Sequence, residues 1–325
     1  MKKTARLAAG ALALGLAALA PLLAQAQAYP AKPVRIVVPY PPGGAVDAVT
    51  RKVAQKLTEQ TGQTFYVENK AGATGTIGAS EVARSAPDGY TLMANDSTYS
   101  LLPHIFKKLP FDHGTDLVPV STFMTAPMAL VVAQDSKYKT LQALLDAARA
   151  NKGGLTYGTG GAGTTPHFSS EALGIAAGVS FLHVPFKGAG EATLALLSGT
   201  IDFQMASTPG VIGQVQGGKA RLLAISGDKR VAALPGTPTF AEAGLKGFSV
   251  INFTGLWAPK GTPPAVMARL QKEVAAAVAS ADVKAYADGL GAVPASAGTE
   301  AFAKMLQDST AYWGKVASNT AFEKE

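Results

Sequence analysis

The chain of 325 residues contains no cysteine. Disulfide bridges, thiol catalysis and thiolate metal sites are therefore excluded, and stability has to come from burial of a core. Charged residues make up only 16% of the chain, and its lysines and arginines are scattered, without interleaved aromatic residues. This pattern excludes a nucleic-acid partner. After residue 28 there is no run of about 18 apolar residues, so no transmembrane helix is predicted there.

The first 28 residues have the three parts of a secretory signal peptide. Lys2, Lys3 and Arg6 form a cationic start, residues 7–23 an apolar centre, and residues 26–28 a small-residue cleavage signal. The mature chain is expected to begin directly after residue 28, in the periplasm. Removal of the leader lowers the net charge from +7 to +4, a mild excess that suits an anionic small ligand.

Apolar runs rich in valine and isoleucine alternate with helical patterns, which is the rhythm of βαβ units and indicates an α/β protein. About 300 mature residues exceed one comfortable core, so two lobes are expected. No flexible linker separates them, and two strands are therefore predicted to cross between the lobes, Ser121–Val132 and Phe248–Ala258. Such a hinge makes a cleft that closes on a ligand. Towards the C-terminus, two amphipathic helices are predicted to pack on this framework.

Three glycine-rich segments stand where a strand should meet a helix: Gly43-Gly44, residues 72–78 and residues 158–164. A single glycine loop often does no more than make the turn. Three of them on the same side of parallel sheets favour a ligand site, because ligands of open α/β folds bind beyond the carboxyl ends of the strands. Bare N–H groups at helix N-termini suit a carboxylate or a phosphate.

Motifs of other functions are incomplete or missing. Gly158, Gly160 and Gly163 have the spacing of a dinucleotide fingerprint, but Val184-Pro185-Phe186 stands where that fold needs an acidic residue for the ribose. The chain has no P-loop, no G-x-S-x-G and no H-E-x-x-H, and its four histidines lack metal-ligand spacing. No catalytic site and no metal site are predicted.

Four side chains near the loops each have a structural and a functional interpretation. Asp47 either caps the amides at the start of its helix or accepts a hydrogen bond from the ligand. His167 is either a structural histidine of a helix start or a ligand donor. Lys187 is either a solvated lysine or a ligand clamp, and Tyr40 belongs either to the core or to the wall of a cleft.

Several ordered segments extend these observations over the mature chain, among them Asn69-Lys70-Ala71-Gly72-Ala73 and Ala86-Pro87-Asp88-Gly89-Tyr90; the full set covers residues 39–51, 69–78, 86–92, 109–112, 116–120, 183–188 and 255–263. In these segments the chain resembles the Bug family, the extracytoplasmic solute receptors of tripartite tricarboxylate transporters. The resemblance implies a two-lobed periplasmic binding protein fold of type II, in which each lobe is a sheet flanked by helices. Two crossing strands join residues 29–127 and 255–325 of lobe 1 to residues 128–254 of lobe 2. It further implies no cofactor, and a cleft that grips a carboxylate through backbone amides and ordered waters.

Carried over residue by residue, the resemblance assigns ligand contacts to small and polar residues of both lobes: Tyr40, Pro42, Gly43, Gly44, Asp47, Ala73, Thr74, Ser97 and Thr98 from lobe 1, and Thr159, Gly160, Thr164, His167, Phe186 and Asp202 from lobe 2. Two departures affect the predicted pocket. Ala71 and Thr74 replace a proline and a glycine that are common in the family, and Phe186 stands where tyrosine is frequent. The identity of the acid therefore does not follow from the resemblance.

The sequence favours a monomeric receptor that captures a small carboxylate and delivers it to a membrane transporter or a sensor. One rival is an exported enzyme that uses His167 with Asp47 or Asp202 as acid and base. Another is an adhesive or structural envelope protein, which would bind no small ligand. Unaltered ligand recovered from the purified protein favours the receptor, and turnover favours the enzyme.

Overall fold

The computed structural model describes residues 29–152, 154–320 and 322–324, and the predicted signal peptide lies outside them. The strands are β1 (Val34–Val38), β2 (Phe65–Asn69), β3 (Thr91–Asp96), β4 (Leu117–Ala133), β5 (Thr156–Thr159), β6 (Leu182–Pro185), β7 (Phe203–Ser207), β8 (Ala220–Ile225), β9 (Ile251–Pro259) and β10 (Val293–Pro294). The helices are α2 (Ala45–Thr61), α3 (Thr76–Ala83), α4 (Leu102–Ile105), α5 (Leu141–Ala150), α6 (Thr165–Ala177), α7 (Ala189–Leu197), α8 (Thr208–Gln216), α9 (Pro264–Ala279), α10 (Ala281–Gly289) and α11 (Thr299–Ala317), with short 3-10 turns η1 (Ala73–Gly75) and η2 (Ser97–Leu101).

The strands follow the order β2-β1-β3-β9-β4-β7-β5-β6. In lobe 1, β1 pairs in parallel with β2 and β3, while β9 pairs antiparallel with β3 and β4. In lobe 2, β5 pairs in parallel with β6 and β7, and β4 pairs antiparallel with β7 and β8. The carboxyl ends of the parallel strands of each lobe therefore lie at one edge of its sheet, which is where loops to the following helices collect.

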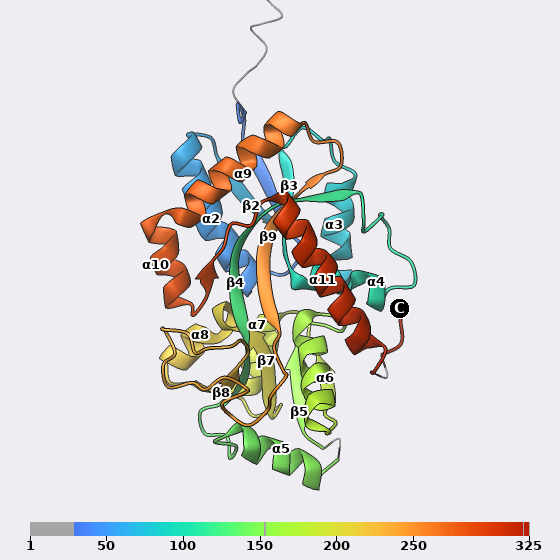
Figure 1. Cartoon of the computed structure of the whole chain (residues 1–325), viewed down its shortest axis with the longest axis vertical. Coiled ribbons are helices and arrows are strands. Elements are labelled where there is room, and N and C mark those ends of the chain that lie inside the picture. Colours follow the sequence, from blue (N-terminus) through green and yellow to red (C-terminus); the bar gives the residue numbers. More distant parts are fainter. Residues whose placement is uncertain (1–28, 153, 321, 325) are drawn as a thin grey trace, which may run out of the picture.

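Strand β4 belongs to both lobes. Its residues Leu117–Pro127 pair with β9, and from Met128 onward it pairs with β7 and β8. Figure 1 shows β4 and β9 side by side between the two lobes. Both crossing strands were predicted; β4 contains the whole predicted range, and β9 begins three residues after the predicted start. The residue boundaries of the lobes stay a prediction.

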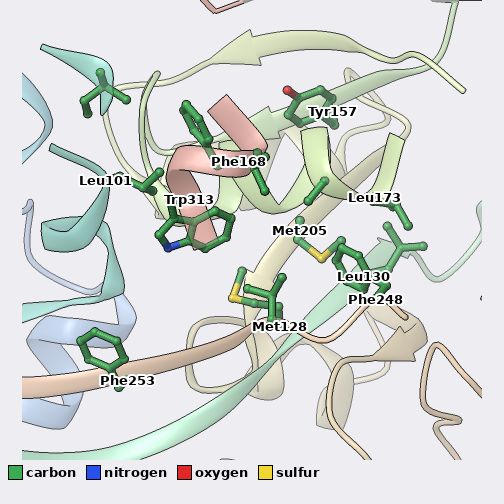
Figure 2. Packing of buried hydrophobic residues seen from close by; sticks show 14 of the residues in the cluster. Leu101, Met128, Leu130, Tyr157, Phe168, Leu173, Met205, Phe248, Phe253 and Trp313 are labelled. Atoms are coloured by element: carbon green, nitrogen blue, oxygen red, sulfur yellow. The ribbon is translucent and has the colours of Figure 1, made fainter. Parts of the chain in front are cut away.

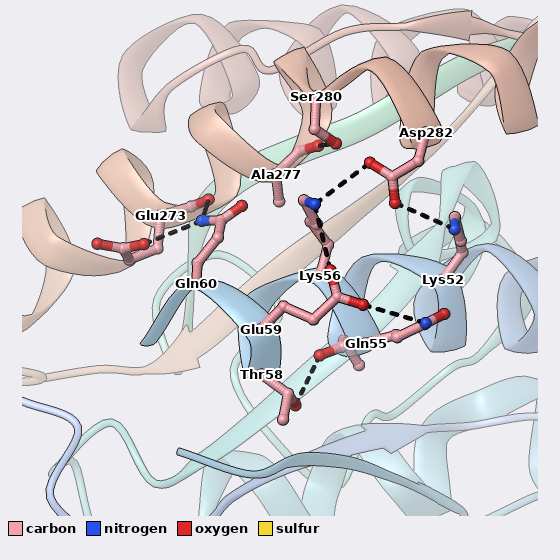
Figure 3. A network of polar contacts seen from close by, with 11 residues as sticks. Lys52, Gln55, Lys56, Thr58, Glu59, Gln60, Glu273, Ala277, Ser280 and Asp282 are labelled. Atoms are coloured by element: carbon pink, nitrogen blue, oxygen red, sulfur yellow. Dashed lines mark hydrogen bonds and ion pairs between the residues drawn. The ribbon is translucent and has the colours of Figure 1, made fainter. Parts of the chain in front are cut away.

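Helix α2 is anchored to the C-terminal helices of lobe 1. The ammonium groups of Lys52 and Lys56 lie 3.2 and 3.4 Å from the Asp282 carboxylate of α10 (Figure 3). The Gln60 amide donates to the Glu273 carboxylate of α9 at 3.0 Å. Surface ion pairs add little to stability, so the main effect of this network is to orient α2. The N-terminus of α2 is thereby fixed in direction.

Helix α11 packs against both lobes. Phe302 near its start contacts Trp257 of β9, with ring centroids 4.8 Å apart. Trp313 near its end packs edge-on against Phe168 of α6, at 6.3 Å (Figure 2). Figure 1 shows α11 running from β9 towards α6. The amphipathic C-terminal helices are as predicted, but the contact of α11 with lobe 2 joins the lobes beside the crossing strands.

Candidate functional site

A cavity of about 390 Å³ lies between the lobes. Lobe 1 contributes residues 40–42 and 44–47, which follow β1, together with Asp96 at the end of β3 and Thr98 shortly after it. Lobe 2 contributes the starts of three helices and the ends of the strands before them. Because both sets of residues follow the carboxyl ends of strands, the cavity lies where an open α/β fold presents its ligand site.

The lobe 1 wall is the N-terminus of α2. Gly44 is the N-cap residue and has no side chain to cap the helix, and the first helical bond runs from the Ala48 N–H to the Gly44 carbonyl at 3.0 Å. Within the described part of the chain, the N–H groups of Gly44, Ala45, Val46 and Asp47 have no hydrogen-bond partner. These donors and the helix dipole together favour an anion at this wall.

The lobe 2 wall is also built from helix N-termini without capping side chains. Gly188 is the N-cap of α7 without a capping side chain, and residues 188–191 line the cavity. Helix α8 contributes its N-cap Ser207 and residues of its first turn, and α6 contributes Thr164 and Pro166. Four helices therefore begin at one cavity, so their positive dipole ends converge on it. Lys187 is the one lysine or arginine among the residues that line it.

The Asp47 carboxylate is held by donors from the loop, from α2 and from β2. It accepts hydrogen bonds from the Gly43 N–H at 3.0 Å, from Arg51 Nε at 3.0 Å and from the Asn69 side-chain amide at 2.9 Å. Burial raises the pKa of this carboxyl, but the bonds from Arg51, Gly43 and Asn69 outweigh burial and hold the pKa below its usual value. Asp47 thus joins the loop to α2 and β2 while it also borders the cavity, and both interpretations of its role stay predictions.

Tyr40 forms part of the cavity wall and is tied to the end of β3. Its hydroxyl lies 2.7 Å from Asn95 Oδ1 and 3.2 Å from Asp96 Oδ1. Asp96 also accepts the Thr98 N–H at 3.0 Å. Burial raises the pKa of the Asp96 carboxyl despite these bonds. Asp96 was not predicted as a site residue, although it immediately precedes Ser97 and Thr98, which were.

Seven of the predicted site residues line the cavity: Tyr40, Pro42, Gly44, Asp47, Thr98, Gly160 and Thr164. Gly43 lies next to them, but its N–H is used by Asp47 and is not offered to a ligand. The first and third glycine loops are therefore brought together across the cavity, as the sequence predicted.

The second glycine loop and Ser97 contact the opposite lobe instead of lining the cavity. The Thr74 hydroxyl donates to the Ala162 carbonyl at 3.0 Å, and its neighbour Ala73 shares its positive φ. The Ser97 hydroxyl lies 2.9 Å from Thr165 Oγ1, and the Thr165 N–H donates to Thr98 Oγ1 at 3.1 Å. These bonds hold the lobes together beside the cavity.

Three predicted residues of lobe 2 lie behind the cavity wall. Thr159 Oγ1 lies 2.7 Å from His183 Nε2, and His167 Nδ1 accepts the Gly163 N–H at 3.0 Å. Phe186 packs against the apolar cluster between β4 and α8. None of the three lines the cavity.

Asp202 lies at the wrong end of its strand for a cleft residue. It precedes β7, and its carboxylate accepts the Thr156 N–H at 2.8 Å and the Thr156 hydroxyl at 3.0 Å. Because β5 and β7 are parallel, this contact marks the amino ends of both strands, whereas the cavity lies beyond their carboxyl ends. The prediction that Asp202 faces the cleft is therefore corrected: it joins two strand starts.

The site residues that the sequence analysis missed are the starts of α7 and α8. Both carried a recognisable signal. Gly188-Ala189-Gly190 is one more glycine-containing junction between a strand and a helix, and Pro209 stands in the first turn of α8, where proline favours a helix start. Gln204 of β7 also lines the cavity, with its Oε1 bonded to the Thr193 hydroxyl at 3.1 Å.

The described residues contain no cluster of three or more His, Cys, Asp or Glu side chains that could hold a metal ion. Among the same residues, no helix has the length and apolar character needed to cross a membrane.

The family model of the tripartite tricarboxylate transporter family receptor matches residues 49–321. The chain belongs to this family. It is also similar to solved structures over most of its length, among them the periplasmic binding protein BugD, at 32% identity and a TM-score of 0.85, with 91% of this chain and all of BugD covered. Receptors of this family are solute-binding proteins.

Two further solved relatives from Rhodopseudomonas palustris hold small acids. Rpa4515 with adipate is 30% identical to this chain, with a TM-score of 0.86, and the match covers 89% of this chain and 97% of that one. MatC with bound malate is also 30% identical, with a TM-score of 0.83 and coverage of 89% and 100%. The two-lobed binding-protein fold and the solute-binding role are thereby confirmed for this chain.

Proposed function

We propose that this protein captures a small carboxylate in the cavity between its lobes, chiefly through backbone amides at helix N-termini. The observation that carries the proposal is the convergence of α2, α6, α7 and α8 on one cavity. The unpaired N–H groups of residues 44–47 are oriented donors that need no lysine or arginine. Hydrogen bonds from such donors to a carboxylate are charge-assisted, and exclusion of water strengthens them.

The acids held by two relatives support the same ligand class. Rpa4515 is described with adipate and MatC with malate, and both resemble this chain over about nine-tenths of its length. The two molecules share a terminal carboxylate and differ in length and hydroxylation. We therefore propose the class, a small carboxylic acid, and leave its length and substituents to the binding experiment below.

The rival enzyme lacks a common site. His167 lies behind the cavity wall, and Asp202 joins the amino ends of β5 and β7. The Asp47 carboxylate already accepts hydrogen bonds from Gly43, Arg51 and Asn69. An acid and a base that act on one substrate have to reach it from hydrogen-bond distance. The positions of these three residues support binding without turnover.

For location and partners we infer export to the periplasm, the compartment named for BugD, after cleavage near Ala28. There the protein, as a monomer, would deliver its ligand either to the membrane subunits of a tripartite transporter or to a sensor. Closure of the lobes about β4 and β9 would present a liganded surface to that partner.

The test begins with native mass spectrometry of protein purified without added ligand, which reports both the oligomeric state and any acid retained. Calorimetric titration with malate and with adipate then follows, and the ligand is recovered and identified afterwards. We expect saturable binding of at least one acid, one molecule per chain, returned unaltered. Thermal stabilisation should grow with the logarithm of free ligand, reaching about 2.7 kcal/mol at a hundredfold excess over Kd. Chemical conversion of the acid, or no binding in a wide panel of carboxylates, would overturn the proposal.

A further inference from the structure

A buried histidine and a half-buried one are stacked behind the loop formed by residues 158–164. The ring centroids of His167, on α6, and His183, on β6, are 4.0 Å apart and the rings are inclined by 12°. His167 is only 6% exposed. Neither ring lines the cavity, but Gly160 and Thr164 of the loop do. The pair therefore lies behind the loop, one layer away from the cavity.

Each histidine holds one point of the loop. The Gly163 N–H donates to His167 Nδ1 at 3.0 Å, and Thr159 Oγ1 lies 2.7 Å from His183 Nε2. Because Nδ1 accepts a hydrogen bond, it carries no proton, and the neutral His167 ring must carry its proton on Nε2. A second proton can enter this ring only at Nδ1, where it would meet the Gly163 N–H.

Gly163 is also the point where the loop meets lobe 1. It has a φ of +74°, and a Cβ built on it would lie 2.5 Å from the end of the Ile105 side chain of α4. No residue other than glycine fits this conformation and contact without strain. The bond to His167 thus fixes the loop at the residue that packs against the opposite lobe.

The surroundings of the pair disfavour charge. Tyr157 of β5 stacks on His183 at 4.9 Å, and Phe322 of the C-terminal segment meets His167 edge-on at 5.6 Å. An acidic group, Glu171 of α6, lies 4.0 Å from His167 Nε2 and accepts the Tyr157 hydroxyl at 2.5 Å. Burial, together with His183, lowers the pKa of His167 to about 3, and burial lowers that of His183 to about 4.

We propose that His167 is a positioning residue for ligand binding: its unprotonated Nδ1 holds the loop of residues 158–164 in the shape that lines the cavity, and a proton taken up there from solvent releases the loop and the ligand. This inference rests on the proposed function. The protonated ring loses the Gly163 bond and places a positive charge 4.0 Å from the partner ring. Acid then weakens binding although no histidine touches the ligand.

The deciding pair of variants is His167→Asn and His167→Gln. The asparagine carbonyl oxygen can stand close to the position of Nδ1 and accept the Gly163 N–H, but it does not titrate. The longer glutamine carries its carbonyl towards the position of Nε2, where it leaves that N–H unpaired. With malate and adipate as probes at about pH 7.5, we expect His167→Asn to bind within about threefold of the wild type and His167→Gln to bind about tenfold more weakly.

The second measurement is the ratio of the wild-type and His167→Asn dissociation constants at matched pH, from about pH 7.5 down to about pH 3. The ligand carboxylate titrates in this range too, but its contribution cancels in the ratio. With a His167 pKa of about 3, we expect the ratio to keep its neutral-pH value down to about pH 4 and to rise about twofold near pH 3, because only the wild type loses its loop bond. Equal pH profiles, or equal losses in the asparagine and glutamine variants at neutral pH, would overturn the inference.

A readout without ligand separates this inference from the proposed function. In ¹H–¹⁵N spectra, the Gly163 amide resonance of the wild type should move as the pH falls towards the low pKa of His167, and that of His167→Asn should not. If no acid binds the wild type at neutral pH, the proposed function fails while this resonance still decides the role of His167. A Gly163 signal that is insensitive to acid would refute that role.

Discussion

Serine at position 44 should weaken ligand binding without damaging the fold. Gly44 has a φ of −81° and a ψ of 172°, which any residue adopts, and a Cβ built there meets nothing within 4 Å. Serine is a better N-cap than glycine because its hydroxyl accepts an N–H of the second or third helical residue. In α2 those residues are Val46 and Asp47, whose N–H groups are without partners in the described chain. The new hydroxyl therefore takes a donor that the carboxylate needs.

Gly44→Ser should change stability and ligand affinity in opposite directions. Replacing glycine by serine at an N-cap stabilises a helix by a few tenths of a kcal/mol, so the melting temperature should stay unchanged or rise slightly. A hydrogen bond to a charged group contributes about 1.5–3 kcal/mol, and its loss weakens binding by about tenfold to a hundredfold. Lower affinity without lower stability is thus the expected signature of Gly44→Ser.

Calorimetry measures both quantities: scanning calorimetry the melting temperature, and titration calorimetry the dissociation constant for malate or adipate. The matched control is Gly298→Ser, because Gly298 is the uncapped N-cap of α11, with a φ of −66°, and does not line the cavity. This control should keep full affinity. Wild-type affinity in Gly44→Ser, or equal losses in both variants, would refute the assignment of the α2 amides to the ligand.

Three further variants test other parts of the account. Asp202→Ala removes the bonds to Thr156 and should cost about 1–3 kcal/mol in urea unfolding, with an unchanged dissociation constant; weaker binding by the folded variant would return Asp202 to the site. Trp313→Ala should lower the free energy of unfolding by about 3–5 kcal/mol, because Trp313 is 1% exposed against Phe168, and a loss below about 1 kcal/mol would contradict the bridging role of α11. The folded pKa of Asp47 lies below its unfolded value near 3.9, so its stabilisation is complete above that value and is lost as the pH falls through the folded pKa; melting temperatures should therefore show Asp47→Asn destabilised at neutral pH and close to the wild type in strong acid, and a constant difference would contradict this sign.

The elements that create the site were largely predictable, because their signals are local. Val34–Val38 is one of the valine-rich apolar runs that indicated an α/β protein, and it forms β1; the glycine pair that follows it marks the start of α2. The third glycine loop likewise lines the cavity through Gly160 and Thr164. Glycine and proline mark the junctions between strands and helices in the sequence, and in a parallel sheet these junctions lie at one edge.

The errors have a different origin. Asp202 was assigned to the cleft because the resemblance places its strand there, whereas Asp202 directly precedes β7 and lies at the opposite end of that strand from the cavity. The family match names a strand, but the position of a residue along that strand decides which edge of the sheet it reaches, since a strand of five residues spans about 17 Å. Contacts between lobes, such as Thr74 with Ala162, depend on packing over long sequence separation and leave no periodic trace.

The central claim is that main-chain amides at converging helix N-termini hold the acid. It is tested most directly by a crystal structure of the protein with the acid that calorimetry selects. The account predicts carboxylate oxygens within about 2.7–3.2 Å of amide nitrogens in the first turn of α2, with further contacts from the starts of the lobe 2 helices. An acid bound outside the cavity, or held in it by side chains such as Lys187 while the α2 amides contact no ligand atom, would contradict the account.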